Sequence, residues 1–397
     1  MESLFAVCAP GLEPIVAQEL RDLGLQAEAA PRFGAGGVRF EASYQGMQRA
    51  NLLLRCADRV LVRLGEFHAA TFSEFETRAG RLPWEKHLSP GRPVAFKVAS
   101  RRSRLYHESA VAMRLPGAIA RRLGQPPAAG GGEAPAEALP QLIVVLLEDD
   151  HCTVSVDSSG ELLHRRSYRL ATAKAPLRET LACAILKASG WDAASPLIDP
   201  FCGSGTIPIE AALLARRIPP GAARRFAFMD WPGFDRAAWP KLLAEKSTAP
   251  AAAPRIMASD RDAGAVRAAR ENAERAGVAG LIEFSCRAVS AIEPTSAPGW
   301  LVCNPPYGVR LRGKNDLRDL YAQLGKVLRA KCAGWRAALL CGDKRLLAGA
   351  GLGFETRLST LNGGLKVSLE CGTIPQASKI AIYRRERPGL DPRPPSA

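Results

Sequence analysis

The chain has 397 residues and carries 54 lysines and arginines against 39 aspartates and glutamates, which gives a formal net charge of +15. Its length allows two or three domains with cores of their own, and the excess of positive charge favours a polyanionic partner such as a nucleic acid. Because the chain has no run of about 18 apolar residues and its ten cysteines form no CxxC pair, we expect no membrane span, metal site or disulfide framework. We therefore expect a soluble protein of the reducing cytoplasm.

The N-terminal part has the pattern of a small α+β unit. Residues 2–8 form a short apolar run, apolar residues over 12–23 recur on one helical face, and residues 37–41 form a second strand. A helix is predicted over 44–60, followed by residues 61–67 and then a turn. The β-α-β order at the start indicates a small α+β unit, and a generic α/β start is an equally open interpretation.

A basic stretch follows a strand predicted over 94–99. It combines fixed positive charge with a hydroxyl group and with a ring that can stack on a base, and a phosphate-contacting edge needs these features. We predict RNA contacts from Lys97, Arg101, Arg102, Arg104 and Tyr106. A solvated loop is the alternative interpretation.

A second basic stretch lies between the two halves of the chain. Residues 125–140, rich in Ala, Gly and Pro, predict a flexible loop before two strands at 141–149 and 152–160. The basic stretch comes next and leads into a helix with an apolar stripe, over 177–189. Its arginines suit either an RNA backbone or a charged linker, and both interpretations stay open for Arg165, Arg166 and Arg169.

Residues 196–212 predict a strand, a tight turn and the start of a helix. Gly203 and Gly205 let the backbone turn sharply, and Asp199 ends the strand. Unpaired N–H groups at a helix N-terminus beside a carboxylate suit a nucleotide-type ligand. A bare turn is the alternative, and we interpret Cys202 as a small turn residue rather than as a nucleophile.

A second carboxylate follows the next predicted strand, at 255–260. Asp260 is placed to accept hydrogen bonds from the two ribose hydroxyls of a nucleoside cofactor. Asp262 is interpreted as the cap of the following helix. The aromatic residues within 222–243 are expected to serve mainly in core packing.

The four residues from Asn304 to Tyr307 are the most informative for chemistry. Two prolines fix φ and remove donors, so the Asn304 side-chain oxygen and the carbonyl oxygen of Pro305 can accept hydrogen bonds from one amine. Holding both hydrogens of an exocyclic amine favours a pyramidal nitrogen whose lone pair faces a methyl donor. Pro306 completes the turn, and Tyr307 can stack on a flipped base.

The C-terminal part adds a helix over 317–332 and a strand over 336–341. A closing hairpin follows, formed by 355–374 together with 379–386, and it has a turn at Asn362 and Gly363. The Pro-rich end is expected to be disordered.

These stretches resemble those of bacterial THUMP-domain RNA methyltransferases, enzymes that use S-adenosylmethionine. The resemblance rests on DPFCGSGT at 199–206, NPPY at 304–307, the aromatic insertion at 222–243 and long segments between residues 37 and 182, and it covers nearly the whole chain. It implies that S-adenosylmethionine is the cofactor. The residues that it implies as cofactor contacts are Asp199, Pro200, Phe201, Cys202, Gly203, Ser204, Gly205, Thr206, Asp260, Arg261, Ala288 and Asn304.

The chain departs from this family's pattern at three positions. Ala288 stands where many relatives have an aspartate that meets the adenine amino group, so adenine recognition must rest on backbone groups or on neighbours. Val309 replaces a glutamate after the NPPY motif, and Ser167 replaces a glycine.

The implied fold is an α+β N-terminal RNA-binding module, ferredoxin-like plus THUMP, followed by a Rossmann-like α/β class I methyltransferase domain. The expected parts are a ferredoxin-like part at 1–43, a THUMP domain at 44–157, a basic linker and helix at 158–190, a methyltransferase domain at 191–386 and a disordered tail at 387–397.

The implied activity is methylation of the exocyclic N2 of a guanine in 23S ribosomal RNA or in a large-subunit assembly intermediate, by a single methyltransferase domain. Guanine N2 of tRNA is the closer alternative, because related THUMP enzymes act there. NPPY motifs also serve adenine N6, cytosine N4 and glutamine N5, but the RNA-binding half argues against a protein substrate. A non-catalytic RNA-binding assembly factor is the alternative from another class, and the departures at Ala288 and Val309 motivate it.

Overall fold

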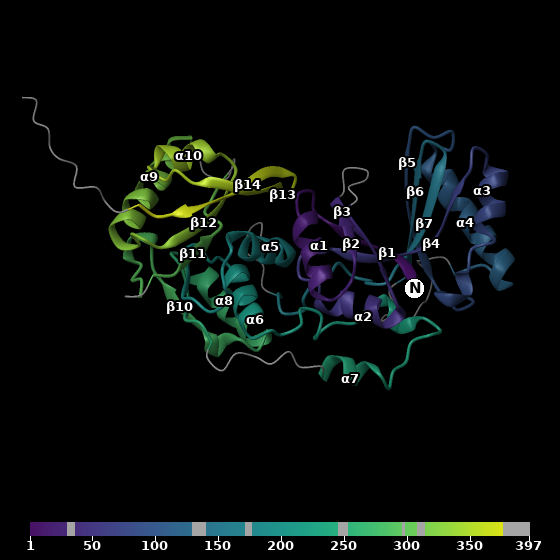
Figure 1. Cartoon of the computed structure of the whole chain (residues 1–397), viewed down its shortest axis with the longest axis horizontal. Coiled ribbons are helices and arrows are strands. Elements are labelled where there is room, and N and C mark those ends of the chain that lie inside the picture. The colour runs from purple at the N-terminus through teal and green to yellow at the C-terminus, as the bar shows by residue number, and fades with distance from the viewer. Residues whose placement is uncertain are drawn as a thin grey trace, which may run out of the picture.

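The computed structural model describes residues 1–29, 36–128, 140–170, 177–244, 253–295, 298–307 and 314–375. The chain forms two seven-stranded sheets, one in the N-terminal half and one in the C-terminal half. Figure 1 shows them side by side along the longest axis of the molecule, with helices α1 and α5 where the halves meet. Every helix within the described residues is too short or too polar to cross a bilayer.

The N-terminal sheet is mixed and has the strand order β2-β3-β1-β4-β7-β6-β5. All neighbouring strands are antiparallel except β5 and β6, which are parallel. The strands are β1 (Glu2–Cys8), β2 (Ala27–Ala29), β3 (Gly36–Ala42), β4 (Arg59–His68), β5 (Val94–Arg101), β6 (Gln141–Glu148) and β7 (His151–Asp157). The helices are α1 (Glu13–Asp22), α2 (Tyr44–Leu53), α3 (Phe72–Ala79) and α4 (Glu108–Leu123).

Strand β4 connects the two parts of this sheet. Its first residues pair with β1 and the rest of its length pairs with β7, with an irregularity between Arg63 and Gly65. Helix α2 ends at Leu53, so the helix predicted over 44–60 is too long at its C-terminal end. The chain is extended at Leu54 (ψ 126°), and β-branched Val60 and Val62 lie in β4 with their side chains buried.

The C-terminal sheet has the strand order β10-β9-β8-β11-β12-β14-β13, parallel up to β12 and antiparallel at the β13–β14 hairpin. The strands are β8 (Leu197–Asp199), β9 (Ile256–Asp260), β10 (Ile282–Cys286), β11 (Trp300–Cys303), β12 (Arg336–Cys341), β13 (Glu355–Asn362) and β14 (Leu365–Thr373). The helices are α5 (Glu179–Ser189), α6 (Thr206–Ala215), α7 (Trp239–Ala244), α8 (Ala263–Arg275), α9 (Lys314–Lys331) and α10 (Lys344–Gly349). This is a Rossmann-like α/β domain with an antiparallel edge, so the predicted fold class is confirmed.

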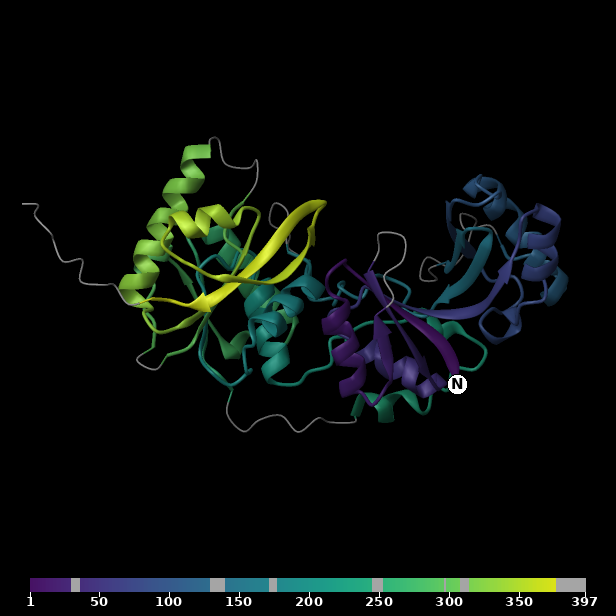
Figure 2. The same ribbon diagram turned by 45° about the horizontal axis from the view of Figure 1, so that its top comes forward.

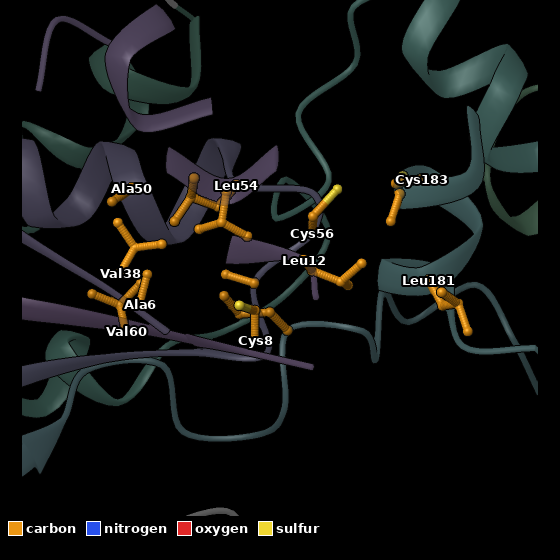
Figure 3. Close-up of a cluster of buried hydrophobic side chains, with 14 of the residues drawn as sticks. Ala6, Cys8, Leu12, Val38, Ala50, Leu54, Cys56, Val60, Leu181 and Cys183 are labelled. Atoms are coloured by element: carbon orange, nitrogen blue, oxygen red, sulfur yellow. The ribbon is translucent and has the colours of Figure 1, made fainter. Parts of the chain in front are cut away.

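The buried core runs without a break from one half of the chain into the other. Cys8, Leu12 and Cys56 of the N-terminal half belong to the same buried cluster as Leu181 and Cys183 of α5. Figure 3 shows these side chains beside one another, and all of them are at most 5% exposed. The two halves therefore share apolar surface that neither could leave in water without a cost of about 25 cal/mol per Å².

The aromatic insertion packs against the N-terminal half, beneath α2. Phe226, Phe228 and Trp231 are buried, which confirms that packing is their structural role. The Trp231 ring meets the His87 ring edge-on at 4.5 Å, and its indole N–H donates to Gln141 Oε1 at 2.8 Å. Figure 2 shows this part of the chain running below the N-terminal sheet. The insertion thus fastens the C-terminal half to the N-terminal sheet.

Candidate functional site

The predicted catalytic and cofactor residues meet at the carboxyl edge of the C-terminal sheet. Strands β8, β9, β10 and β11 are neighbouring parallel strands, so their carboxyl ends lie on the same edge. Asp199 ends β8, Asp260 ends β9, and Asn304 directly follows β11. Ligands of open α/β sheets bind at this edge, where the strand order changes direction.

The glycine turn has the shape that the sequence predicts. Gly203 and Gly205 both have positive φ, 52° and 87°, which side chains with a Cβ adopt only at a cost. A Cβ at Gly205 would also lie 2.9 Å from the Cβ of Ala269 on α8. Gly205 is the N-cap of α6 and gives that helix no side-chain cap, so N–H groups at its start stay available to a ligand.

Two side chains fix this turn from neighbouring elements. The Gly203 N–H donates to Asp260 Oδ2 at 3.0 Å, and the buried Asn272 donates from Nδ2 to the Ser204 carbonyl at 3.0 Å. The turn is therefore held rigid by β9 and by α8 before any ligand binds. Pro200, Phe201 and Thr206 complete it between β8 and α6.

Asp199 is a buried carboxylate that is only half satisfied. Its Oδ1 accepts the Phe201 N–H at 3.1 Å, while Oδ2 is buried and has no hydrogen-bond partner. Burial, together with the nearby Asp260, raises the pKa of Asp199 to about 8. Burial also holds the pKa of the Cys202 thiol well above its ordinary range, which agrees with a turn residue and not with a thiolate nucleophile.

Asp260 keeps acceptor capacity although it already accepts two backbone hydrogen bonds. Its Oδ2 takes the Gly203 N–H and its Oδ1 takes the Asp262 N–H, each at 3.0 Å. A carboxylate has about four acceptor positions, so lone pairs remain for a ligand's hydroxyls. Asp262 caps α8 by accepting from the N–H groups of Gly264 and Ala265, which confirms its interpretation as a cap.

Residue 288 is an alanine, so it offers no carboxylate to a ligand at this edge. Ala288 caps a short 3-10 turn, Val289–Ala291, and the neighbouring Arg287 pairs with Glu293 at 3.3 Å. Arg261 lies on the same edge, where its carbonyl lies 3.7 Å from Cys286 Sγ. A cavity of about 190 Å³ lies on the adjacent face of β9 and β10 and is lined by Met257, Ser259, Phe284 and Arg287 among others. Asp199 and Asp260 are not among its lining residues.

The four residues after β11 present a second unsatisfied acceptor. Asn304 Oδ1 is buried and has no hydrogen-bond partner. The next two residues, Pro305 and Pro306, are prolines and have no backbone N–H that could satisfy this oxygen. A buried acceptor without a donor costs about 1–3 kcal/mol, and a ligand amine at this position would remove that cost.

Tyr307 is held by a residue that we did not predict to belong to the site. Asn362, the last residue of β13, donates from Nδ2 to the Tyr307 hydroxyl at 2.6 Å. The sequence marks Asn362 only as part of a turn, and the turn itself is formed by Gly363 and Gly364, both with positive φ. A hairpin signal carries no information on which distant side chain its tip contacts.

The first basic stretch lies on the surface, at the end of β5. Lys97 and Arg101 are exposed, and Tyr106 is 67% exposed with its ring 4.1 Å from that of His107. Arg102 pairs with Asp149 at 2.8 Å and with Glu148 at 3.0 Å, and Arg104 lies 3.7 Å from Asp150. These predicted RNA contacts are therefore accessible to solvent. Acidic residues at the β6–β7 turn partly neutralise the charges of Arg102 and Arg104.

The second basic stretch is largely interior, which corrects two predictions. The Arg166 side chain is 2% exposed, donates to the carbonyls of Leu163 and Arg55, and lies 3.5 Å from Glu210 Oε1. The Arg169 side chain is 11% exposed and lies 3.1 Å from Glu179 Oε1. Contact of these two arginines with RNA is the wrong interpretation, because each guanidinium is enclosed by protein acceptors.

Of the three predicted arginines, Arg165 is exposed and pairs with Glu161 at 2.9 Å. The signal that was missed is Glu210, the lone charged residue in the apolar helix α6, which requires a buried cation. Several other predictions lie outside the described residues: those for Val309 and for the segment after residue 375, and most of the loop over 125–140.

Models of two protein families match the chain. The model described as "RMKL-like, methyltransferase domain" matches residues 166–363, and the one described as "RlmL ferredoxin-like domain" matches residues 3–61. The first match covers the glycine turn, Asp260 and the four residues from Asn304 to Tyr307. The second extends through α2 into the start of β4.

Curated relatives and solved structures are similar over most of the chain. The Synechocystis sp. protein named "Putative RNA methyltransferase slr0064" is 36% identical over 374 residues, which is 92% of this chain and 95% of that protein. The "Ribosomal RNA large subunit methyltransferase K/L" of Methylococcus capsulatus is 37% identical over 92% of this chain and 50% of its own length. The chain thus spans about half the length of the K/L relative.

The crystal structure of SMU.472 complexed with SAH is similar with a TM-score of 0.83 and 32% sequence identity. The similarity covers 95% of this chain and 99% of that one. It therefore extends over both sheets and over the edge that carries Asp199, Asp260 and Asn304.

Proposed function

The chain belongs to the family of RMKL-like RNA methyltransferases, and from this membership we propose that it methylates the exocyclic N2 of a guanine in 23S ribosomal RNA, with S-adenosylmethionine as the methyl donor. The names of the K/L relatives refer to RNA of the large ribosomal subunit, which supports this substrate class. Large-subunit RNA or an assembly intermediate would be met in the cytoplasm.

The carboxyl edge of the C-terminal sheet fits S-adenosylmethionine. The unpartnered Oδ2 of Asp199 and the open N–H groups at the start of α6 suit the amino and carboxylate groups of the methionine part. The remaining lone pairs of Asp260 suit the ribose hydroxyls, and the backbone around Ala288 is left for the adenine. When bound, this cofactor supplies a methyl group on a sulfonium, and SAH, which is bound in the structure of SMU.472, is what remains after transfer.

The buried, unpartnered oxygen of Asn304 is the observation that carries the reaction type. In the proposed complex, Asn304 Oδ1 and the Pro305 carbonyl accept the two N–H bonds of the target amine and fix the direction of its lone pair. Tyr307 supplies the flat surface on which the flipped base rests. A strong base is unnecessary before transfer, because the nitrogen proton becomes acidic once the nitrogen carries the methyl group and is then lost to water.

The N-terminal half would supply the grip on RNA. Its second part resembles a THUMP domain, and its exposed residues Lys97, Arg101, Arg104 and Tyr106 combine charge with a stacking ring at one edge of the sheet. In this proposal Arg102 contributes less, because Asp149 and Glu148 already share its charge.

The test is transfer of labelled methyl groups from S-adenosylmethionine to RNA of a strain that lacks this protein, followed by nucleoside analysis of separated rRNA and tRNA. Label in N2-methylguanosine of large rRNA is the expected result. Label in tRNA would move the substrate, label in N6-methyladenosine would overturn the base, and no label on naked RNA or on assembly intermediates would favour a non-catalytic assembly factor.

Asn304→Ala is the matching variant. We expect it to lower the transfer rate about 10²–10³-fold, because one of the two acceptors that orient the amine is lost. Cofactor affinity, measured by calorimetry, should change far less. A fully active Asn304→Ala protein would refute the proposed role of this residue.

A further inference from the structure

The ring of Tyr307 is supported by the far edge of the sheet. Its hydroxyl accepts a hydrogen bond from Asn362 Nδ2 at 2.6 Å, although 55 residues separate the two in sequence. The ring also lies close to Gly342, where a Cβ would be 3.4 Å from Tyr307 Cδ2. Tyr307 directly follows two prolines and is half-buried, so these contacts help to fix the direction of its ring.

The hairpin that carries Asn362 is in turn set by the N-terminal half. Gly11, in the loop between β1 and α1, has φ +89°, and a Cβ on it would lie 2.1 Å from the carbonyl oxygen of Ser359 on β13. This loop and β13 are therefore in direct backbone contact. Figures 1 and 2 both show the β13–β14 hairpin reaching from the C-terminal sheet toward α1.

Only a short, paired length of strand separates the two contacts. Ser359 and Asn362 lie on β13 in register with Ser368 and Leu365 of β14. Three residues of strand span about 10 Å, and a strand paired along this length moves as a unit. A displacement of the N-terminal half at Gly11 would therefore reach Tyr307 through Asn362.

We propose that Asn362 is a positioning residue that holds the Tyr307 ring for the target base. We also propose that the β13–β14 hairpin couples the position of this ring to the packing of the N-terminal half at Gly11. The inference rests on the proposed function, since it assigns Tyr307 to the base that is methylated. The Tyr307 ring would thus be ordered for the target base of a bound RNA only when the two halves are correctly packed.

The first experiment is a double-mutant cycle with Asn362→Ala and Tyr307→Phe in the methyl-transfer assay. If Asn362 acts through the hydroxyl of Tyr307, each single variant lowers kcat about tenfold and the double variant is no slower than either. The Kd for S-adenosylmethionine stays within about twofold of wild type, because both variants leave the glycine turn, Asp199 and Asp260 unchanged. Asn362→Asp restores most of the rate, since its carboxylate can accept a hydrogen bond from the phenol.

The second experiment compares two glycine variants of the same half. Gly11→Ala places a methyl group against Ser359, whereas Gly24→Ala imposes a similar backbone strain (φ +77°) with nothing within 4 Å. We expect Gly11→Ala to lower kcat and Gly24→Ala to leave it unchanged when both proteins are folded at the assay temperature. In the Asn362→Ala background, Gly11→Ala should have little further effect.

Three results would overturn the proposal: wild-type kcat in Asn362→Ala, losses that multiply in the double variant, or equal losses in Gly11→Ala and Gly24→Ala. If the wild-type protein transfers no methyl group to any RNA, the proposed function is refuted and the positioning role is not yet tested by activity. The positioning role is then judged by fluorine NMR of protein labelled with 3-fluorotyrosine. The Tyr307 signal, assigned by its absence in Tyr307→Phe, must shift in Asn362→Ala and in Gly11→Ala, and an unchanged signal rejects the role.

Discussion

Two arginine-rich segments of similar composition have opposite surroundings in this molecule. The segment at the end of β5, with Arg101, Arg102 and Arg104, is exposed, and two of its arginines pair with the acidic turn between β6 and β7. The segment before α5 places Arg166 and Arg169 among buried acceptors of both halves. The density of positive charge along the chain is therefore a poor predictor of RNA contact unless the buried acidic residues that pair with the arginines are also counted.

The interior segment joins the N-terminal half to the cofactor edge. Arg166 donates to the carbonyl of Arg55 at 2.6 Å and pairs with Glu210 of α6, whose Oε1 also accepts the Tyr168 hydroxyl at 3.0 Å. Arg169 donates to Thr206 Oγ1 at 2.8 Å, at the first residue of α6. The positive charges of this segment thus hold the helix that follows the glycine turn.

Replacing one arginine of the interior segment should have the largest effect. Arg166→Ala leaves Glu210 buried without its cation, so the free energy of unfolding should fall by about 3–5 kcal/mol. Guanidinium unfolding of both proteins measures this difference. The control is Arg165→Ala, one residue away and exposed, which should change the stability by no more than about 0.5 kcal/mol. Equal stability of the two variants would contradict the assignment of Arg166 to the core.

The interior segment should also make stability depend on pH. Burial raises the pKa of Glu179 to about 7, against the opposing charge of Arg169. A carboxyl whose pKa is higher in the folded state than its usual 4.5 stabilises the fold below pH 4.5 and loses this contribution as pH rises through 7. Between pH 5 and pH 8, wild type should therefore lose about 1–3 kcal/mol relative to Glu179→Gln.

Denaturant unfolding at several pH values measures this difference, and the exposed segment provides the comparison. Arg102 lowers the pKa of Asp149 through a side-chain hydrogen bond, so this carboxyl stays ionised over the same range. Asp149→Asn should accordingly leave the pH profile parallel to that of wild type. Parallel profiles for Glu179→Gln as well would show that Glu179 has an ordinary pKa.

Removing the exposed positive charges should have the smallest effect in free energy. It should weaken RNA binding and leave the stability of the fold unchanged. Changing Arg101, Arg102 and Arg104 together to Ala should weaken RNA binding roughly tenfold and reduce its salt dependence, because fewer counterions are released. Thermal stability should stay the same. Filter binding at several salt concentrations measures both quantities, and unchanged affinity and slope would place the RNA site elsewhere.

The opposite change, removal of a negative charge beside the same arginines, provides a second test of RNA binding at this edge. Asp149→Asn removes the negative charge of one of the two acidic partners of Arg102, while Glu148 and the arginines stay in place. If this edge binds phosphates, RNA affinity should rise by a small factor. A decrease would show that the pair positions the loop rather than shielding its charge.

The local patterns of this sequence predicted most of the secondary structure and the residues that meet at the carboxyl edge of the C-terminal sheet. The glycines at 203 and 205, the acids that end β8 and β9, and the turn after β11 were readable because each depends on neighbours in sequence: φ freedom, strand ends and missing N–H donors. Parallel strands then bring these ends to one edge by topology alone.

The partners of individual side chains were decided only by the tertiary structure. Arg101 and Arg166 have the same chemistry and similar basic neighbours, yet one is exposed and the other is enclosed by Glu210 and two carbonyls. Asn362 reaches Tyr307, and Gly11 reaches Ser359, across distances in sequence that no local pattern encodes. Burial and long-range pairing depend on how the two halves pack together, and that packing is a property of the whole fold rather than of any one segment.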